Sequence, residues 1–210
     1  MRSKIGIVCM FLGAALLGGA IYLFVCNQQE AEAAQNHSLD LLPQLMEVIE
    51  LQAEAVTEPA TYAQPLGTPV EYLDPSAFEM TEVEIDGYGY IGYLSIPKLE
   101  LELPIMADWD YPRLRIAPCR YTGSVRGEDL VLMAHNYARH FGKLSKLVAG
   151  DSVVFTDMDG VVTSYEVVAT DLLDPYAVEE MTSGDFDLTL FTCTYGGQSR
   201  VTVYCDIASR

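Results

Sequence analysis

Residues 188–206 read LTLFTCTYGGQSRVTVYCD, and this stretch decides the fold class. Its two halves, residues 188–192 and 200–206, flank the turn Tyr195-Gly196-Gly197. Short runs of this kind on either side of a glycine turn are typical of an antiparallel hairpin. The C-terminal part of the chain is therefore expected to consist of short strands.

The same pattern continues upstream to Tyr88. A second hairpin is expected around the acidic, glycine-ended turn Asp157 to Gly160, and residues 129–134 form a continuous apolar run typical of a central strand. Seven or eight short strands with little helix predict a mainly β fold, a closed or nearly closed barrel. The expected elements are strands at residues 90–96, 99–105, 129–134, 152–156, 161–168, 188–192 and 200–206, and a short helix from Phe141 to Leu147.

The N-terminus carries an apolar run, Ile5 to Val25, without charge or proline. A helix of these 21 residues rises roughly 30 Å, the thickness of the hydrocarbon core of a bilayer. Arg2 and Lys4 favour a cytoplasmic N-terminus. We therefore expect residues 1–26 to be a cytoplasmic tip and a single-pass signal anchor in the cell membrane, with everything after them extracytoplasmic.

Two other interpretations of the N-terminus stay open. Ala31-Glu32-Ala33 resembles a signal-peptide cleavage site, although the apolar run is long for a signal peptide. Cys26 is a candidate for lipid modification, although Val25 is larger than the small residue usually found before such a cysteine. All three interpretations place the rest of the chain outside the cytoplasm.

Charge is distributed unevenly along the chain. Residues 27–210 hold ten basic and thirty acidic residues, a net charge of −20, because residues 1–26 carry the other two basic residues and no acids. This balance argues against nucleic acid or anionic lipid as a partner. Residues 27–87 are expected to form an acidic stalk or linker. Within it, Leu39 to Val56 is a possible amphipathic helix, interrupted near its start by Pro43, that either belongs to the stalk or packs against the domain.

Three of the five cysteines, Cys119, Cys193 and Cys205, lie beyond the N-terminal segment. One disulfide among three would leave a free thiol, which outside the cell invites a functional explanation. Cys193 ends a predicted strand just before the glycine turn, whereas Cys205 is within a strand and Cys119 is in a connecting segment. Buried structural cysteine is the common alternative. Position favours Cys193 as the reactive thiol, and a disulfide between the other two stays open.

Two further side chains are expected beside Cys193. His135 follows an apolar strand at its C-terminal end, where loops present catalytic groups, so it is the better base candidate. His140 begins the short helix, where a solvated side chain is expected, and His37 lies in the stalk. Arg200 begins the strand paired with that of Cys193, and a guanidinium beside a thiol favours the thiolate. A solvated edge arginine is the alternative.

Three separated stretches resemble, in order, those of a known family, the sortases. The resemblance covers about residues 88–208. The stretches are Gly92 to Leu99 with Leu103 to Ile105, similar to the opening strands; Ala134-His135-Asn136 with Phe141 to Leu144, similar to the segment of the catalytic histidine; and Thr189 to Cys193 followed by Arg200, similar to the signature TLxTC…R.

The resemblance implies an eight-stranded sortase-type β-barrel with short helices over residues 88–210, working as a cysteine transpeptidase. Such enzymes cleave an LPxTG-like sorting-signal peptide of a surface protein and hold the protein as a thioester. They transfer it to an amine acceptor such as a peptidoglycan precursor or a pilin lysine. By this resemblance Cys193 is the nucleophile, His135 the general acid and base, and Arg200 the contact to the substrate backbone and the oxyanion.

Further expectations concern the surroundings of the nucleophile. The backbone N–H of Thr194 is a natural oxyanion donor beside Arg200, and Thr192 either hydrogen-bonds substrate or is structural. No cofactor is expected. Calcium is a possible ligand of an acidic loop, although solvated carboxylates are favoured there. The acidic residues of this loop are Glu179, Glu180, Asp185 and Asp187.

The short connection from Thr170 to Asp187 argues against sortase subclasses with a long helical insertion, and the lack of a second apolar span argues against typical pilin-polymerising members. Two alternative functions stay open as well. One is a surface cysteine peptidase that hydrolyses the thioester with water. The other is a non-catalytic surface binding module in which Cys193 is structural.

The protonation of the thiol and imidazole also leaves two regimes open. At pH 7 an ordinary thiol is about 3% thiolate and an ordinary imidazole about 25% protonated. Their ion pair dominates only if mutual stabilisation exceeds about 2 kcal/mol. A partly buried pair beside Arg200 supplies this stabilisation, and an exposed pair does not.

Overall fold

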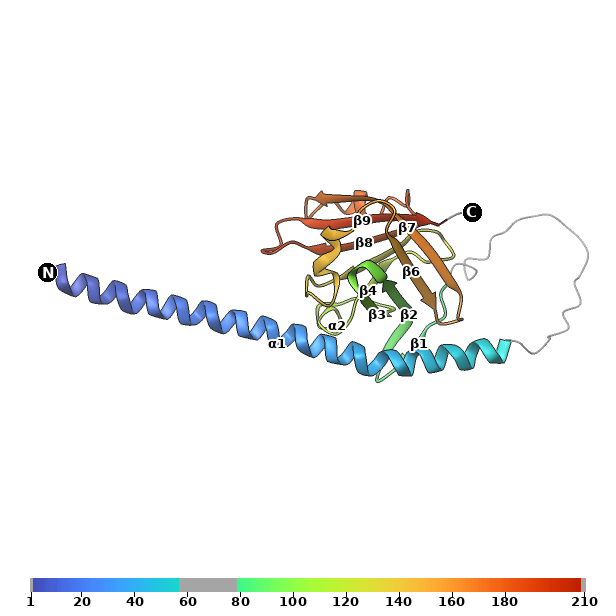
Figure 1. Cartoon of the computed structure of the whole chain (residues 1–210), viewed down its shortest axis with the longest axis horizontal. Helices are drawn as coiled ribbons and strands as arrows, with labels where there is room; N and C mark the ends of the chain where they lie inside the picture. Colours follow the sequence, from blue (N-terminus) through green and yellow to red (C-terminus); the bar gives the residue numbers. More distant parts are fainter. Residues whose placement is uncertain (1, 57–78, 209–210) are drawn as a thin grey trace, which may run out of the picture.

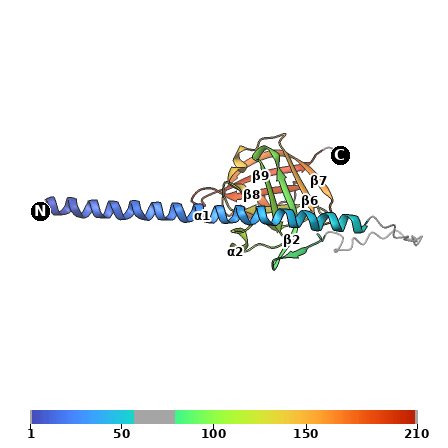
Figure 2. The same cartoon turned by 60° about the horizontal axis from the view of Figure 1, so that its bottom comes forward.

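A computed structural model describes residues 2–56 and 79–208 and places one long helix beside a β-barrel (Figure 1). The helix, α1 (Arg2–Val56), crosses one side of the barrel when the molecule is turned (Figure 2). The part of the predicted stalk between residues 57 and 78 lies outside the described residues.

Every strand expected from the sequence is present, and two short ones, β1 and β4, are additional. The strands are β1 (Val83–Ile85), β2 (Tyr88–Ile96), β3 (Leu101–Met106), β4 (Cys119–Thr122), β5 (Leu130–Ala134), β6 (Ser152–Asp157), β7 (Val162–Leu173), β8 (Leu188–Cys193) and β9 (Arg200–Ile207). The short helices are η2 (Pro97–Leu99), α2 (Tyr111–Leu114), η3 (Phe141–Lys146) and α3 (Val178–Met181).

Eight of the described strands close into a ring in the order β2-β3-β4-β5-β8-β9-β7-β6, and the pairing of β2 with β6 completes it. The predicted eight-stranded barrel is confirmed, with β1 as an extra partner of β2. Closure takes place at Gly92, which pairs with Ile105 of β3 and Asp157 of β6. Its φ is 144°, and a Cβ there would lie 2.1 Å from the carbonyl oxygen of Thr156. The close approach of β2 to β6 therefore requires glycine.

Alternate strand positions fill the barrel interior, as a period of two requires. On β8, Leu188 and Leu190 belong to the main interior cluster, whereas Phe191 belongs to a separate cluster on the outer face with Val131 and Met181. The outer face of β8 is therefore the face that can carry a site.

One face of α1 packs against the barrel. Leu41, Leu45 and Ile49 join Tyr90 and Met106 in a second apolar cluster outside the barrel. The sequence left open whether the helix packs against the domain, and in the structure it does. The buried residues of α1 recur at helical spacing and are Ala34, Ser38, Leu41, Leu42, Leu45 and Ile49.

The helix differs from expectation in length and continuity. It does not begin at Leu39 but runs from Arg2, and it continues through Pro43 instead of being interrupted there. The loss of one backbone hydrogen bond at Pro43 is offset by buried leucines on both sides of it, at positions 42 and 45.

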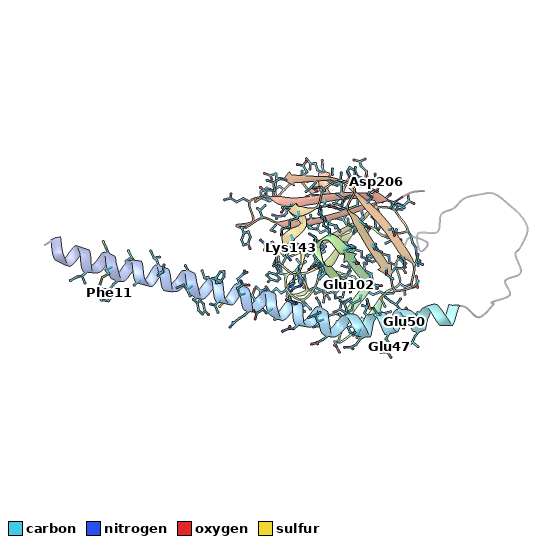
Figure 3. All side chains as sticks on the ribbon, viewed as in Figure 1. Phe11, Glu47, Glu50, Glu102, Lys143 and Asp206 are labelled. Carbon is cyan, nitrogen blue, oxygen red and sulfur yellow. The ribbon has the colours of Figure 1, made fainter. Side chains whose placement is uncertain are left out.

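The N-terminal part of α1 projects beyond the barrel. Phe11 lies on this projecting part, whereas Glu47 and Glu50 lie on the part beside the barrel (Figure 3). Large apolar side chains between Ile7 and Val25 are exposed. In the portion of the chain that the structure describes, α1 is the one helix long and apolar enough to cross a membrane.

Candidate active site

Three neighbouring strands bring the predicted catalytic residues together. β5 and β8 run parallel with Ala134 opposite Thr192, so His135, one residue further, lies at the level of Cys193. β8 and β9 run antiparallel with Cys193 directly opposite Arg200. As a result His135, Cys193 and Arg200 all line one cavity of about 200 Å³.

Aromatic and apolar side chains form the walls of this cavity. Trp109 stacks on Tyr121 with 5.6 Å between ring centroids, and Tyr121 meets Phe191 edge to face at 5.5 Å. Met181 of α3 packs with Phe191. The other lining residues are Tyr111, Leu114, Met133, Ala134, Pro175, Val178 and Thr192.

The sequence predicts Thr192 as a site residue, but it predicts no site role for the other wall residues. The alternation of β5 and β8 carries a signal for two of them, because Met133 and Phe191 are two residues before His135 and Cys193 and share their faces. Trp109 and Met181 come from connections whose course follows from no local pattern.

A larger cavity, of about 520 Å³, lies between α1 and the barrel and is lined by Leu39, Leu42 and Leu103 among others. None of the predicted site residues lines it. The nucleophile, the base and the cation all border the smaller cavity, which we therefore take as the candidate active site.

The three cysteines of the barrel differ in burial. Cys193 is partly exposed, whereas Cys119 and Cys205 are fully buried. Burial raises the pKa of each buried thiol to about 12, and neighbouring aspartates add to the effect. All three are free, and Cys119 and Cys205 lie in different apolar clusters, so the disulfide left open by the sequence does not form.

The three histidines of the chain have different surroundings. Burial lowers the pKa of His135 below 6.5, and Arg115 lowers it further. His135 is therefore mainly neutral at pH 7, the form a general base needs. His140, expected to be solvated, is instead fully buried, and burial with the nearby His135 lowers its pKa to about 4. His37 lies on α1, 3.4 Å from the hydroxyl of Tyr90.

Hydrogen bonds hold Arg200 and Thr194 in the glycine turn after β8, and another holds Thr192 to β5. Arg200 Nη1 donates to two carbonyl oxygens of the turn at 3.2 and 3.3 Å. The Thr194 N–H donates to the Ser199 oxygen at 2.9 Å, so it can serve an oxyanion only if this bond exchanges. The Thr192 hydroxyl donates to the Ala134 oxygen at 2.8 Å and ties β8 to β5, which is the structural alternative for this residue.

The four acidic residues considered for calcium lie between β7 and β8. Glu179 and Glu180 belong to α3, and Asp187 accepts a hydrogen bond from the N–H of Ile207 at 2.7 Å. Within the described ranges, 2–56 and 79–208, no group of three or more His, Cys, Asp or Glu side chains could hold a metal ion. The expectation of no cofactor, with calcium as the less favoured alternative at this loop, stays a prediction that a calcium titration can test.

A closed barrel with a thiol, an imidazole and a guanidinium around one cavity defines a cysteine-dependent enzyme of acyl transfer. The family model described as Sortase domain matches residues 94–208, more than half of the chain. The chain therefore belongs to the sortase family, whose members are cysteine transpeptidases.

Solved structures of sortases are similar to this chain. Sortase C1 of Streptococcus agalactiae is 26% identical, with 60% of this chain and 72% of that one covered and a TM-score of 0.52. Sortase C of Clostridium perfringens SM101 is 21% identical, with 87% and 91% covered and a TM-score of 0.53. Sortase A of Corynebacterium diphtheriae is 19% identical, with 88% and 94% covered and a TM-score of 0.53. These structures are of both C and A types, so they indicate the fold and not a subclass. A search of curated proteins found no match.

Proposed function

We propose that this chain is a membrane-anchored sortase that cleaves an LPxTG-like sorting signal. It holds the acyl part as a thioester on Cys193 and transfers it to an amine of the cell wall or of another surface protein. The observation that carries the proposal is the meeting of the partly exposed Cys193 with His135 and Arg200 at one cavity.

The chemistry needs one proton carrier and one oxyanion contact. His135 takes the thiol proton, and the sulfur of Cys193 attacks the carbonyl carbon of the scissile peptide bond. The oxyanion forms beside the guanidinium of Arg200, and the protonated His135 gives its proton to the departing amine. The acceptor amine then attacks the thioester carbonyl and loses a proton to His135, and the sulfur leaves.

The lowered pKa of His135 helps to choose between the two protonation regimes of Cys193 and His135, a dominant ion pair or a minor one. Burial disfavours the imidazolium, so a dominant ion pair needs more stabilisation than two ordinary groups would. This supports the regime in which the competent ion pair is a minor fraction of the free enzyme and forms on demand.

The cavity walls support an apolar peptide as substrate. Trp109, Tyr121, Phe191 and Met181 offer surfaces against which the leucine and proline of an LPxTG-like signal can be buried. Burial of one such side chain contributes about 1.5–3 kcal/mol.

The apolar part of α1 supports a single-pass anchor, with the N-terminus cytoplasmic and the barrel extracytoplasmic. The amine acceptor is a peptidoglycan precursor or a pilin lysine. The sortase C of Streptococcus pneumoniae, 24% identical, is described in terms of pilin substrate specificity, which makes a pilin lysine worth testing here. A net charge of −18 speaks against nucleic acid as a partner.

The test is mass spectrometry of the full chain in detergent micelles after mixing with a panel of sorting-signal peptides. We expect an acyl adduct on Cys193 that is absent in Cys193→Ala. Labelling of Cys119 or Cys205 instead would contradict the assignment of the nucleophile. His135→Ala and Arg200→Ala should each lower turnover by about 10²–10⁴-fold, and His37→Ala, remote from the cavity, should not.

A short oligoglycine separates transfer from hydrolysis. A ligated product supports the transpeptidase, and release of the free acid alone supports the surface peptidase. A binding module predicts that Cys193→Ala retains all peptide binding and that the thiol resists alkylation.

A further inference from the structure

Tyr137 lies between the imidazoles of His135 and His140, in the loop that joins β5 to η3. Its ring centroid is 5.0 Å from that of His135 and 5.5 Å from that of His140, with interplanar angles of 30° and 47°. The residue is buried, with 6% of its surface exposed. Tyr137 therefore packs against His135 from behind the cavity.

The Tyr137 hydroxyl makes a contact with the N-terminal helix. It donates to Glu30 Oε2 of α1 at 3.2 Å, across 107 residues of sequence. Burial and the Glu30 carboxylate raise the pKa of Tyr137, so the hydroxyl keeps its proton and stays a donor. The contact joins the helix to the loop of the proposed catalytic base.

Backbone hydrogen bonds tie the rest of this loop together. The N–H groups of His140 and Gly142 both donate to the Tyr137 oxygen at 3.0 Å, and the N–H of Phe141 donates to the His135 oxygen at 3.3 Å. The loop is therefore tied on both sides of Tyr137, whose ring lies against that of His135.

Charged and titratable groups face His135 from each element packed around it. Arg115 lowers the pKa of His135 in addition to burial, and Glu30 opposes both. These groups are Glu30 from α1, Arg115 at the end of α2, His140 before η3, Tyr137 of the same loop, and Cys193 and Arg200 from β8 and β9.

We propose that Glu30 and Tyr137 are positioning residues for His135, so that the helix of the proposed anchor is part of the working active site. The inference rests on the proposed role of His135 as acid and base. Neither side chain touches the substrate. Both act through the placement of the imidazole, and Glu30 acts through its charge as well.

The first test needs no turnover. The chain has three histidines, so the imidazole of His135 can be followed by NMR in the full chain in micelles after histidine labelling. We expect the titration midpoint of His135 to fall in Glu30→Gln, because the carboxylate favours the imidazolium. The matched control is Glu32→Gln, an exposed carboxylate on the same helix, which should leave the midpoint unchanged. A midpoint that stays at the wild-type value in Glu30→Gln would overturn the proposal.

The second test uses the peptide reaction. Tyr137→Phe keeps the ring between the imidazoles and removes only the hydroxyl, so it should fold. We expect kcat to fall about fivefold, the equivalent of one hydrogen bond, with little change in KM. The limb of the pH profile that His135 governs should move to lower pH in Glu30→Gln, and not in Glu32→Gln.

The double variant decides whether the two residues act as one unit. If they do, Glu30→Gln adds no further loss of kcat to Tyr137→Phe at a pH where His135 is neutral in every variant, so that the separate charge effect of Glu30 does not enter. Losses that multiply would show independent roles and contradict the proposal. A wild-type chain without any turnover would contradict the proposed function. The NMR titration would still show whether Glu30 acts on the imidazole of His135.

Discussion

Cys193 lies on β8 and Cys205 lies on the neighbouring strand β9, yet their surroundings are opposite. Cys205 points into the barrel core and Cys193 onto the outer face, at the edge of a cavity that also holds a base and a cation. A buried thiol with a pKa of about 12 stays protonated at pH 7. From the sequence, Cys193 was favoured by its strand position and by the Arg200 and His135 expected nearby, because the hairpin around residues 194–199 is a local pattern.

His140 is a buried base whose two ring nitrogens have no hydrogen-bond partner. Its pKa falls from 6.5 to about 4 in the folded chain. Because the folded-state pKa is depressed, the stability linked to His140 is complete above pH 6.5 and is lost as the pH falls toward 4. We expect the free energy of unfolding to drop by about 3 kcal/mol between pH 7 and 4 from this residue.

Urea unfolding at several pH values checks this expectation. His140→Leu should lack the His140 component, so its stability should fall less steeply toward pH 4 than that of the wild type. His37→Gln, at a partly exposed histidine, should retain the wild-type slope. Equal slopes in wild type and His140→Leu would contradict the expectation.

How well each residue of the candidate site could be predicted depends on how far apart in the sequence its neighbours lie. The register of Cys193 and Arg200 follows from one hairpin and could be predicted. His135 required the further assumption that its strand neighbours that of Cys193, which the resemblance to sortases supplied. The contact of Glu30 with Tyr137 could not be predicted, because it joins two elements that only the whole fold brings together.

At the level of elements, η3 and the loop before it are packed without spare room at Gly142. A Cβ there would lie 2.4 Å from the Asn136 oxygen and 2.7 Å from the Tyr137 oxygen. Gly142→Ala should therefore displace the loop of His135 and cost about 1–3 kcal/mol of stability.

Thermal unfolding and peptide turnover measure the two effects of Gly142→Ala, and both should be lower than in the wild type. Ser145→Ala changes an exposed position of the same short helix and should leave both unchanged. A Gly142→Ala chain with wild-type turnover would show that the loop yields without moving His135.

The docking of α1 depends on a few leucines. Leu45 is fully buried against the barrel, whereas Leu39 on the same helix is 57% exposed. We expect Leu45→Ala to cost about 2–5 kcal/mol, and Leu39→Ala to cost much less. Hydrogen exchange of α1 and chemical unfolding report the docking and the overall stability, and equal effects of the two variants would contradict this packing.

Elements were predictable where a local pattern was strong. The seven expected strands all carry an alternating or continuous apolar pattern, and all are present. β4 was missed because it is four residues long, follows Pro118, and is joined to β3 by the single parallel pair Met106 with Cys119. The full extent of α1 was missed because Pro43 indicated an interruption that tertiary packing overrides.

At the scale of the whole molecule, closure of the barrel has no signal within any one strand. It depends on Gly92, where β2 meets β3 and β6 together, and the sequence offers only an isolated glycine within a strand pattern. The prediction of eight barrel strands came from the resemblance to sortases and not from the strand patterns.

If α1 anchors the chain in a membrane, as proposed, its continuity fixes the height of the candidate active site above that membrane. With the apolar run across a bilayer, as proposed, Glu30 stands at most about 7.5 Å above Val25, the depth of the lipid headgroups. The helix then holds the barrel at a short, fixed distance from the membrane. The enzyme would act on substrates that are still attached to the lipid surface.

A longer helical segment between the apolar run and the barrel should change which substrates the enzyme reaches. Seven extra helical residues between Val25 and Glu30 would add roughly 10.5 Å while keeping the same helix face toward the barrel. We expect such a chain to process a soluble sorting peptide at the wild-type rate and a membrane-tethered one more slowly. Equal rates on both, measured in the same vesicles, would mean that the height of the barrel does not select its substrates.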